Sequence, residues 1–401
     1  MTLHTVLVAA FLSSAVGVPQ EGEEGFDFEA SGQVGIEARW FPEDPTFPGQ
    51  LDGVQGSFFA EPEFRWSDAD RTNQFLITPF LRVDGRDDER SHFDLREAYW
   101  RHVGEEWDVL VGMNRVFWGV TESRHLINVV NQVDAVEDVD EEDFLGQPMI
   151  QAGRETDYGR FDLFLMTGFR ERNFPGPKGR LRFGIPIDSD GAQYEEDLEE
   201  WRPDLALRWS HYVGDVDLGL SAFHGTGREP NLALAPSGGR LIPTYFLINQ
   251  LGLDLQYTTD AWLWKFEGLI REGQGDTFAA AVGGVEYTIF QLNDTDADLG
   301  LLAEVLYDGR DDDVFPTVFD NDVFVGSRYA LNDVQSTEVL AGVVVDMQDG
   351  LGSARIEAER RLGDDWKLEF EAQVFFEDEA STPLSFFEND SFLTLRLSWF
   401  F

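Results

Sequence analysis

A strict alternation of apolar and polar side chains constrains this chain more than any other feature. Residues 391–401 read SFLTLRLSWFF, in which Leu, Leu, Leu, Trp and Phe occupy the odd positions from 393 onward, and Thr, Arg and Ser lie between them. Successive side chains of a β-strand point to opposite faces, so this segment has one apolar and one polar face. About 9 to 11 residues is the length that a tilted strand needs to cross a bilayer. The segment therefore predicts a membrane-spanning β-strand.

The same alternation persists along the chain. In residues 366–376 (WKLEFEAQVFF) every second side chain is apolar, and Lys, Glu, Glu and Gln lie between them. A face this rich in charge cannot lie in a dry core. The sequence predicts about 18 strands, near residues 26–41, 54–67, 73–84, 91–102, 106–118, 148–155, 158–170, 202–213, 215–224, 248–258, 262–271, 277–289, 297–308, 322–332, 336–347, 352–361, 366–376 and 391–401.

The lengths of the connecting segments give an independent test of this pattern. If the first strand starts in the periplasm, every long connection lies on the outer side, and the other connections are short, for example Gly104-Glu105. The expected outer connections are residues 42–53, 85–90, 119–147, 171–201, 225–247, 309–321 and 377–390. Short periplasmic turns and longer outer loops are typical of outer-membrane barrels. The fold class expected is all-β, a single antiparallel transmembrane barrel of 16 to 18 strands, preferably 18, with long acidic extracellular loops.

Composition excludes several other classes of protein. The chain has no Cys, so disulfides, thiolate metal sites and cysteine nucleophiles are excluded. After residue 17 there is no run of 18 apolar residues, so no helical membrane span is expected. The six His have no accompanying G-x-S-x-G motif or other set of residues typical of a hydrolase. We therefore expect no enzyme activity, no cofactor and no metal site.

The two ends of the chain indicate its destination. Residues 1–17 contain a short apolar stretch and small residues at Ala15-Val16-Gly17, which resembles a secretory signal peptide, although no Lys or Arg precedes that stretch. Residues 18–401 are then the barrel. The aromatic Phe401 resembles the C-terminal signature of Gram-negative outer-membrane proteins, which the barrel-assembly machinery recognises. This resemblance implies the outer membrane of a Gram-negative bacterium.

The inner face of the barrel is expected to be polar, because charged side chains recur on the non-lipid parity of nearly every strand. Candidate pore-lining residues are Arg82, Asp94, Arg96, Asn114, Arg170, Arg208, Lys265, Glu304, Arg328, Arg355, Glu357, Glu369 and Arg396. Buried charges must be paired or hydrated. Two interpretations remain open: a lumen packed shut by Arg–carboxylate ladders, or a water-filled channel. A barrel of 16 to 18 strands generally leaves an aqueous channel.

The formal net charge of −46 is concentrated in runs that this topology assigns to outer loops. Residues 134–143 (DAVEDVDEED) are the densest run, and residues 195–200 and 308–313 are two more. The simplest interpretation is a solvated, self-repelling outer surface. The alternatives are divalent cations that bridge these loops to lipopolysaccharide, or a loop that folds inward as a cation-favouring constriction.

One stretch carries more specific motifs. Residues 95–100 (LREAYW) precede Gly112-Met-Asn-Arg-Val-Phe-Trp-Gly119, and Asn128-Val-Val-Asn-Gln-Val-Asp134 follows. This order resembles uncharacterised porin-like outer-membrane β-barrel proteins and, more distantly, alginate-export-type porins. In that pattern Asn114 takes the place of a Gln, and Gln132 the place of a Pro. The resemblance implies a functional constriction near these residues. The candidates for the constriction loop are Trp118, Asn128, Asn131, Asp134, Glu137 and Asp138. In the alternative interpretation, Trp118 and Gly119 end a strand at the interfacial aromatic belt and the Asn residues cap a turn.

These patterns together predict a porin-like channel for passive or facilitated diffusion of small polar solutes. Because wall acids slightly outnumber wall bases, we expect a weak preference for cations. The alternative function is a non-conducting structural or adhesin-type barrel. The expected partners are outer-membrane lipid and lipopolysaccharide, the barrel-assembly machinery through Phe401, and further copies of this chain, but no nucleic acid.

Overall fold

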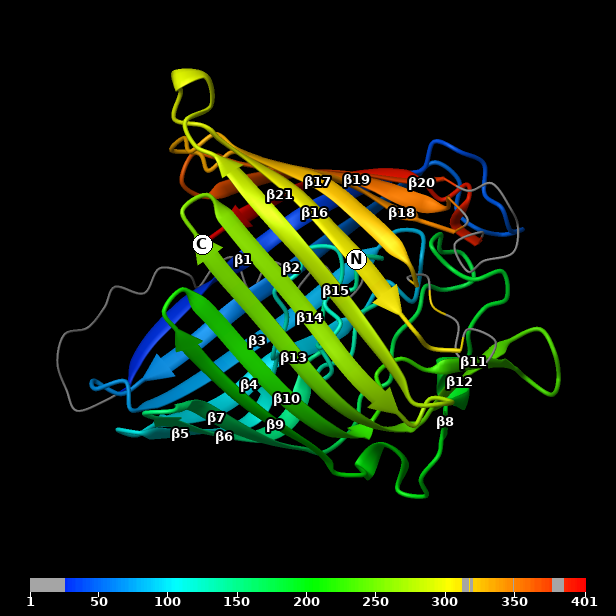
Figure 1. Cartoon of the computed structure of the whole chain (residues 1–401). Helices are drawn as coiled ribbons and strands as arrows, with labels where there is room; N and C mark the ends of the chain where they lie inside the picture. Colours follow the sequence, from blue (N-terminus) through cyan, green and yellow to red (C-terminus); the bar gives the residue numbers. More distant parts are fainter. Residues whose placement is uncertain (1–25, 312–316, 318–319, 349, 377–385) are drawn as a thin grey trace.

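The alternating segments form a closed barrel of 18 antiparallel strands (Figure 1). The structure, a computed structural model, describes residues 26–311, 317, 320–348, 350–376 and 386–401, so the expected signal peptide lies outside the described residues. The barrel strands are β1 (Asp27–Trp40), β2 (Val54–Ser67), β3 (Asn73–Asp84), β4 (Phe93–Val103), β5 (Trp107–Asn114), β6 (Gln147–Thr156), β7 (Gly159–Met166), β9 (Asp204–Val213), β10 (Val216–Thr226), β13 (Leu247–Thr259), β14 (Trp262–Glu272), β15 (Phe278–Ile289), β16 (Asp298–Asp308), β17 (Asp322–Ala330), β18 (Glu338–Asp346), β19 (Gly352–Leu362), β20 (Trp366–Phe376) and β21 (Phe392–Phe400).

The barrel closes where β21 pairs with β1. The register joins Gln33 to Phe400 at one rim and Trp40 to Leu393 at the other. Every remaining strand pairs with the next barrel strand along the chain, and the one irregular register lies between Thr78 and Pro79 of β3. Proline has no N–H to donate to the neighbouring strand, so a bulge is expected there. The preferred strand count of 18 is confirmed.

The outward face is apolar between its two rims, as the alternation predicts, and polar side chains such as His224, Asn249 and Glu272 lie on it at the outer rim. Ile36 is 60% exposed on the outside of β1, whereas its neighbour Glu37 is 3% exposed on the inside. Aromatic side chains gather on the outside near the rim with the short turns: Phe28, Trp66, Trp100, Trp107, Trp209, Trp262, Trp264, Trp366 and Trp399. Such a girdle is typical of the membrane interface of outer-membrane barrels. In the described part of the chain no helix is long and apolar enough to cross a membrane.

The long connections lie together at one end of the barrel (Figure 1). Two of them, residues 167–203 and 227–246, are joined by a small sheet in which β12 pairs with β11 and β8. Its strands are β8 (Gln193–Tyr194), β11 (Asn231–Leu234) and β12 (Leu241–Tyr245), and the first of the two loops also contains the short 3₁₀ turns η1 (Ser189–Gly191) and η2 (Glu199–Trp201). A third 3₁₀ turn, η3 (Leu292–Asp294), lies at the other rim, between β15 and β16 (Figure 1). The small sheet fixes the two loops to each other over part of the outer opening.

The connection between β5 and β6, residues 115–146, folds into the barrel and is called the inner loop below. β5 ends at Asn114 rather than at the predicted residue 118, because the backbone leaves the wall there. The expectation that the acidic run 134–143 forms a solvated outer surface is wrong for residues 134–140, whereas residues 141–143 are exposed. The acids of residues 134–140 pair with arginines of the inner wall, which makes burial favourable where an unpaired carboxylate would be costly.

Candidate functional site: the inner loop and its cavity

Two wall glutamates hold the first half of the inner loop. Glu267 of β14 is 0% exposed, and its Oε1 accepts hydrogen bonds from the backbone N–H groups of Val120 (2.6 Å) and Thr121 (3.0 Å) and from the Thr121 hydroxyl (2.7 Å). Glu304 of β16 accepts from the backbone N–H of Glu122 (2.9 Å) and of Ser123 (2.8 Å). Hydrogen bonds to an ionised acceptor are about twice as strong as neutral ones. The wall thus fixes four consecutive residues of the loop.

Gly119 makes this close approach possible. Its φ of +155° is one that L side chains rarely adopt, and a Cβ there would lie 3.1 Å from Glu267 Oε1 and 2.9 Å from His125 Nδ1. Glycine therefore lets the backbone turn and pass directly over the carboxylate.

Apolar packing continues the attachment. Ile127, Val129 and Val130 of the loop are almost fully buried against inward-facing side chains of the wall, in a cluster with Met149 and Phe164. Leu126 packs in a second cluster with Leu269, Phe278, Ala280, Val282, Leu302, Leu306 and Phe324. The expectation of a polar inner face is therefore wrong for the outer half of β14–β17, where the loop and the wall share a dry core.

Trp118 and Asn131 lie inside the barrel, not at its lipid interface. Trp118 is 4% exposed and packs edge-to-face on Phe164, with ring centroids 5.6 Å apart. The Asn131 side chain accepts from the Val116 N–H (2.8 Å) and donates to the carbonyls of Asn114 and Leu145 (2.9 Å each), so it joins the two ends of the loop. The alternative interpretation of Trp118 as a belt residue is wrong.

Ion pairs hold the second half of the loop. The Nε and Nη2 groups of Arg82 donate to the two oxygens of Glu137 at 2.7 and 2.5 Å. Asp134 pairs with Arg96 at 2.5 Å and accepts from His92 at 3.1 Å. Burial alone would raise the pKa of Asp134, but these two partners hold it well below its usual value.

The next two acids pair with arginines farther along the wall, on the two sides of the β1–β21 closure. Asp138 pairs with Arg39 of β1 at 2.7 Å, and Asp140 pairs with Arg355 of β19 at 2.8 Å. Burial and the nearby Asp138 raise the pKa of Asp140 to about 6, although Arg355 opposes this shift. Asp140 therefore changes charge within the physiological pH range.

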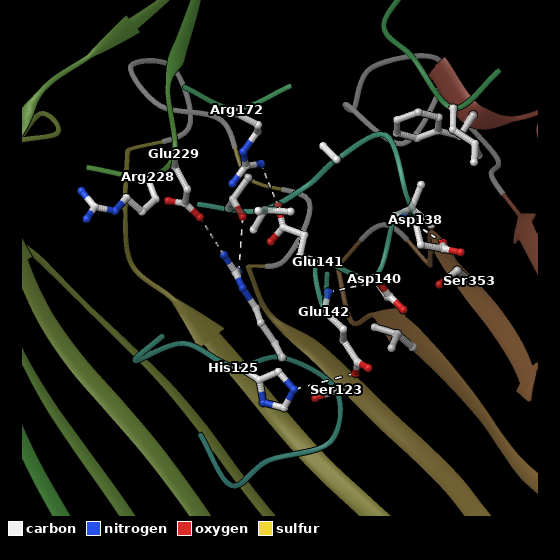
Figure 2. A pocket seen from close by; sticks show the side chains of 18 of the residues that line it. Ser123, His125, Asp138, Asp140, Glu141, Glu142, Arg172, Arg228, Glu229 and Ser353 are labelled. Atoms are coloured by element: carbon white, nitrogen blue, oxygen red, sulfur yellow. Dashed lines mark hydrogen bonds and ion pairs between the residues drawn. The ribbon is translucent and has the colours of Figure 1, made fainter. Parts of the chain in front are cut away.

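A cavity of about 840 Å³ lies between the inner loop and the inner face of β17–β20 (Figure 2). Its charged lining residues include Asp138, Asp140, Glu141, Glu142, Arg172, Arg228, Glu229, Arg271, Arg310, Arg328 and Arg355. In Figure 2 Asp138 and Asp140 lie on one side, Arg172, Arg228 and Glu229 lie on the other, and Glu141 lies between them, paired with Arg172. Phenylalanines line the same space, so the cavity is amphipathic. A volume of this size suits a small-molecule ligand.

Glu229 is the carboxylate at the centre of the basic side. It lies 2.9 Å from Arg271 Nη1, 3.1 Å from Arg310 Nη1 and 3.5 Å from Arg124 Nη2. Burial would raise the pKa of Glu229, but these guanidinium groups hold it below its usual value. Glu229 therefore stays ionised and joins its own loop to the wall and to two other loops.

All predicted pore-lining residues lie on the inner side of the barrel, but their surroundings differ. Arg328, Arg355 and Glu357 line the cavity. Arg82, Asp94, Arg96, Asn114 and Glu304 are buried beneath the inner loop and contact it or its supports. Arg170, Arg208, Lys265 and Arg396 pair with Asp94, Asp254, Glu122 and Glu37, and Glu369 pairs with Lys367. Their role in conduction stays a prediction.

Of the predicted constriction residues, Asn128 and Asp138 line the cavity, and Trp118, Asn131, Asp134 and Glu137 fix the loop. Sequence reasoning missed Glu267, Glu229 and the apolar contacts of Leu126 and Ile127. The inward parity of Glu267 and the apolar string LINVV inside a polar loop were the available signals.

One group of side chains has the composition of a metal site. His92, Asp134 and Glu137 offer ligand atoms within 4.8 Å of one another. Arg96 and Asn173 already bond to Asp134, and Arg82 occupies both oxygens of Glu137. A cation would have to displace these donors, so the group is better described as part of the ion-pair network.

Comparison with known proteins identifies similar folds but no family. No protein-family model and no curated sequence matches the chain. Among solved structures, Wzi of Escherichia coli, an outer-membrane carbohydrate-binding β-barrel involved in group 1 capsule assembly, matches at 9% identity over 98% of this chain and 86% of its own, with a TM-score of 0.54. A mutant of the Rh. blastica porin matches at 13% identity over 94% of this chain and all of its own, with a TM-score of 0.46.

At these identities the likeness concerns the fold alone. The chain has the fold of an outer-membrane β-barrel. The resemblance of residues 95–134 to alginate-export-type porins is not confirmed by any match.

Proposed function

We propose that this barrel is a porin-like channel of the Gram-negative outer membrane, through which small polar solutes diffuse past the inner loop. The single observation that carries the proposal is the cavity of about 840 Å³, which the inner loop leaves between itself and β17–β20. A loop that filled the whole cross-section would leave no such space. Loop and wall together supply charged groups of both signs there, which suits hydrated polar solutes.

A weak preference for cations is part of the proposal. Five carboxylates of the inner loop line the cavity: Glu122, Asp138, Asp140, Glu141 and Glu142. Four of them pair with cations of the wall or, for Glu141, of a neighbouring loop, and eight arginines line the same cavity, so the expected preference is modest.

The attachment of the first half of the loop supports a second candidate, a non-conducting binding or structural barrel. Its dry contacts with the wall close the lumen on the side of β5–β17. If the remaining space is not continuous, the cavity would serve binding alone.

Conductance of the purified full chain in planar bilayers distinguishes the two candidates. The channel predicts stepwise ion currents, and a 10-fold KCl gradient should give a reversal potential of the sign for cation selectivity. The double variant Glu267→Gln/Glu304→Gln, which weakens the hold on the loop, should conduct more than the unchanged protein. Absence of current from correctly folded protein would support the binding barrel, and clear anion selectivity would contradict the cation preference.

A further inference from the structure

One buried arginine of the cavity differs from all the others. The arginines buried in the described part of the chain are Arg39, Arg82, Arg90, Arg96, Arg180, Arg182, Arg228 and Arg271. Seven of them lie within 4 Å of a carboxylate oxygen. For Arg182, which is 7% exposed, no carboxylate oxygen among the described residues lies within that distance.

The contrast is sharpest with Arg180, two residues earlier in the same loop. Arg180 pairs with Asp390 and stacks on Phe41, with its Cζ 4.7 Å from the ring centroid. Arg182 stacks on Phe47 at 5.2 Å in the same manner, but Asp87 and Asp390 act on it only from a distance. Burial lowers the pKa of Arg182, yet a guanidinium remains charged at any physiological pH. A buried guanidinium that no described carboxylate neutralises is costly, and a ligand carboxylate bound to it would offset that cost.

The hydrogen bonds of the Arg182 guanidinium leave one of its edges unused. Nη1 donates to the carbonyl oxygens of Phe183 (2.7 Å) and Gly184 (3.3 Å). Nε is buried and has no hydrogen-bond partner, and no bond joins Nη2 to a described residue. No described residue therefore uses the two donors on the edge formed by Nε–H and Nη2–H. Through this same edge Arg82 holds both oxygens of Glu137, so the protein itself shows which group fits it.

Apolar side chains surround this edge. Arg182 lines the cavity together with Phe174, Phe183, Ile185, Phe386 and Phe387. The ring of Phe183 lies 5.6 Å from that of Phe386 and 6.2 Å from that of Phe387. A ligand on the Arg182 edge would therefore place its remaining atoms near aromatic rings, where apolar groups gain contact energy.

We propose that Arg182 and the neighbouring phenylalanines form a binding subsite for solutes that carry a carboxylate next to an apolar ring or chain. The subsite would select a class of solute for the proposed channel. Only its physiological use rests on the proposed channel function. Binding itself does not require conduction. Carboxylates are favoured over other anions because two parallel N–H groups match their two oxygens.

Calorimetric titration of benzoate into the detergent-solubilised full chain tests the subsite. We expect saturable binding of benzoate, weaker binding of acetate, which lacks the ring, and no competition from benzylamine, which has the opposite charge. Arg182→Gln should weaken benzoate binding about 10-fold or more, because one charge-assisted contact is lost. Arg182→Lys should retain part of the affinity, because lysine keeps the positive charge but lacks the two parallel N–H groups of a guanidinium.

The matched control is Arg86→Gln in another outer loop, where an exposed guanidinium bonds to the Asp52 carbonyl and does not line the cavity, so no change in binding is expected. Heat-dependent mobility on gels verifies that each variant forms the barrel. If Arg182→Gln does not fold, Arg182→Lys and Phe183→Ala provide the same test. Absence of saturable benzoate binding, or equal affinity in the folded Arg182 variants, would overturn the proposal. Benzoate binding that depends on Arg182 in a barrel without ion current would leave the subsite intact and reject the channel.

Discussion

The two halves of the inner loop are attached to the barrel by different forces. Residues 115–133 rest on apolar side chains and on backbone hydrogen bonds to Glu267 and Glu304. Residues 134–142 are held mainly by ion pairs with arginines of β1, β3, β4 and β19. Apolar contacts change little with pH, whereas ion pairs depend on protonation. The first half is therefore a fixed support, and the second half is the adjustable wall of the cavity.

Removing Trp118, the main apolar contact of the first half of the inner loop, should have the largest effect on the stability of the barrel. Trp118→Ala should lower the free energy of unfolding by about 4 kcal/mol, because burial of a large aromatic side chain is lost and a void remains. Guanidinium-induced unfolding in lipid vesicles measures this loss. Trp201→Ala is the control, since Trp201 is 70% exposed in an outer loop and should change stability by less than about 0.5 kcal/mol. Equal effects of the two variants would contradict the assignment of Trp118 as a support.

Glu267→Gln tests the hydrogen bonds of the same half. The amide keeps one acceptor oxygen but turns an N–H₂ group toward loop donors, so we expect a loss of about 2 kcal/mol. Hydrogen exchange of residues 120–127 should become faster, while residues 134–138 keep their protection. As a control, Glu272→Gln on the same strand should leave both segments unchanged, because Glu272 contacts Asn249 and no residue of the loop.

The second half should respond to pH through His92. Burial lowers the pKa of His92, but Asp134 and Glu137 raise it further, so its net pKa lies above the usual value. A raised histidine pKa adds stability below about pH 6.5, and this stability is lost as the pH rises through the folded-state pKa. Raising the pH from 6 to 9 should lower the free energy of unfolding and increase hydrogen exchange at residues 134–137, after correction for the intrinsic rate. Burial lowers the pKa of His125, but Glu142 and Glu267 raise it further, so residues 120–127 also contain a group that titrates in this range. The apolar residues 129 and 130 should not change, and His92→Gln should remove the difference at residues 134–137.

The smallest expected effect is on the selectivity of the proposed channel for cations over anions. Asp140, whose pKa is about 6, becomes neutral as the pH falls through that value, and the cavity loses one negative charge. In the proposed channel, the cation-to-anion permeability ratio should fall by up to about twofold between pH 8 and pH 5. Reversal potentials in a KCl gradient measure the ratio. Asp140→Asn should reduce the pH dependence of the ratio. An unchanged pH response would assign the titration to another group, such as His125 of the same cavity, whose pKa is also raised.

The sequence alone was sufficient to predict the strands that form the wall of the barrel. The alternation that assigns Ile36 to lipid and Glu37 to the interior is local, and each strand except the closing pair finds its partner in the next barrel strand. Strand limits such as Val54–Ser67 and Asn73–Asp84 agree with the predicted limits for the same reason.

The path of the inner loop could not be predicted in this way. Its backbone bonds to Glu267 and Glu304 join residues that are more than 140 positions apart, and no local pattern encodes such a contact. The acidic run 134–143 suggested a solvated surface because its basic partners are single residues scattered over four distant strands. Nor does the sequence distinguish Arg182 from Arg180, since the difference between them lies only in the position of Asp390.

The pairing of β1 with β21 has a practical consequence for work on this protein. The backbone N–H of Gly32 bonds to the carbonyl of Phe401, and the reverse bond is also formed, each at 3.1 Å. Both strands therefore reach the rim with the short turns side by side. A fluorophore or affinity tag attached near either position is held away from the opening that solutes would enter. Two labels, one on each strand, would report whether the pairing of β1 with β21 is intact.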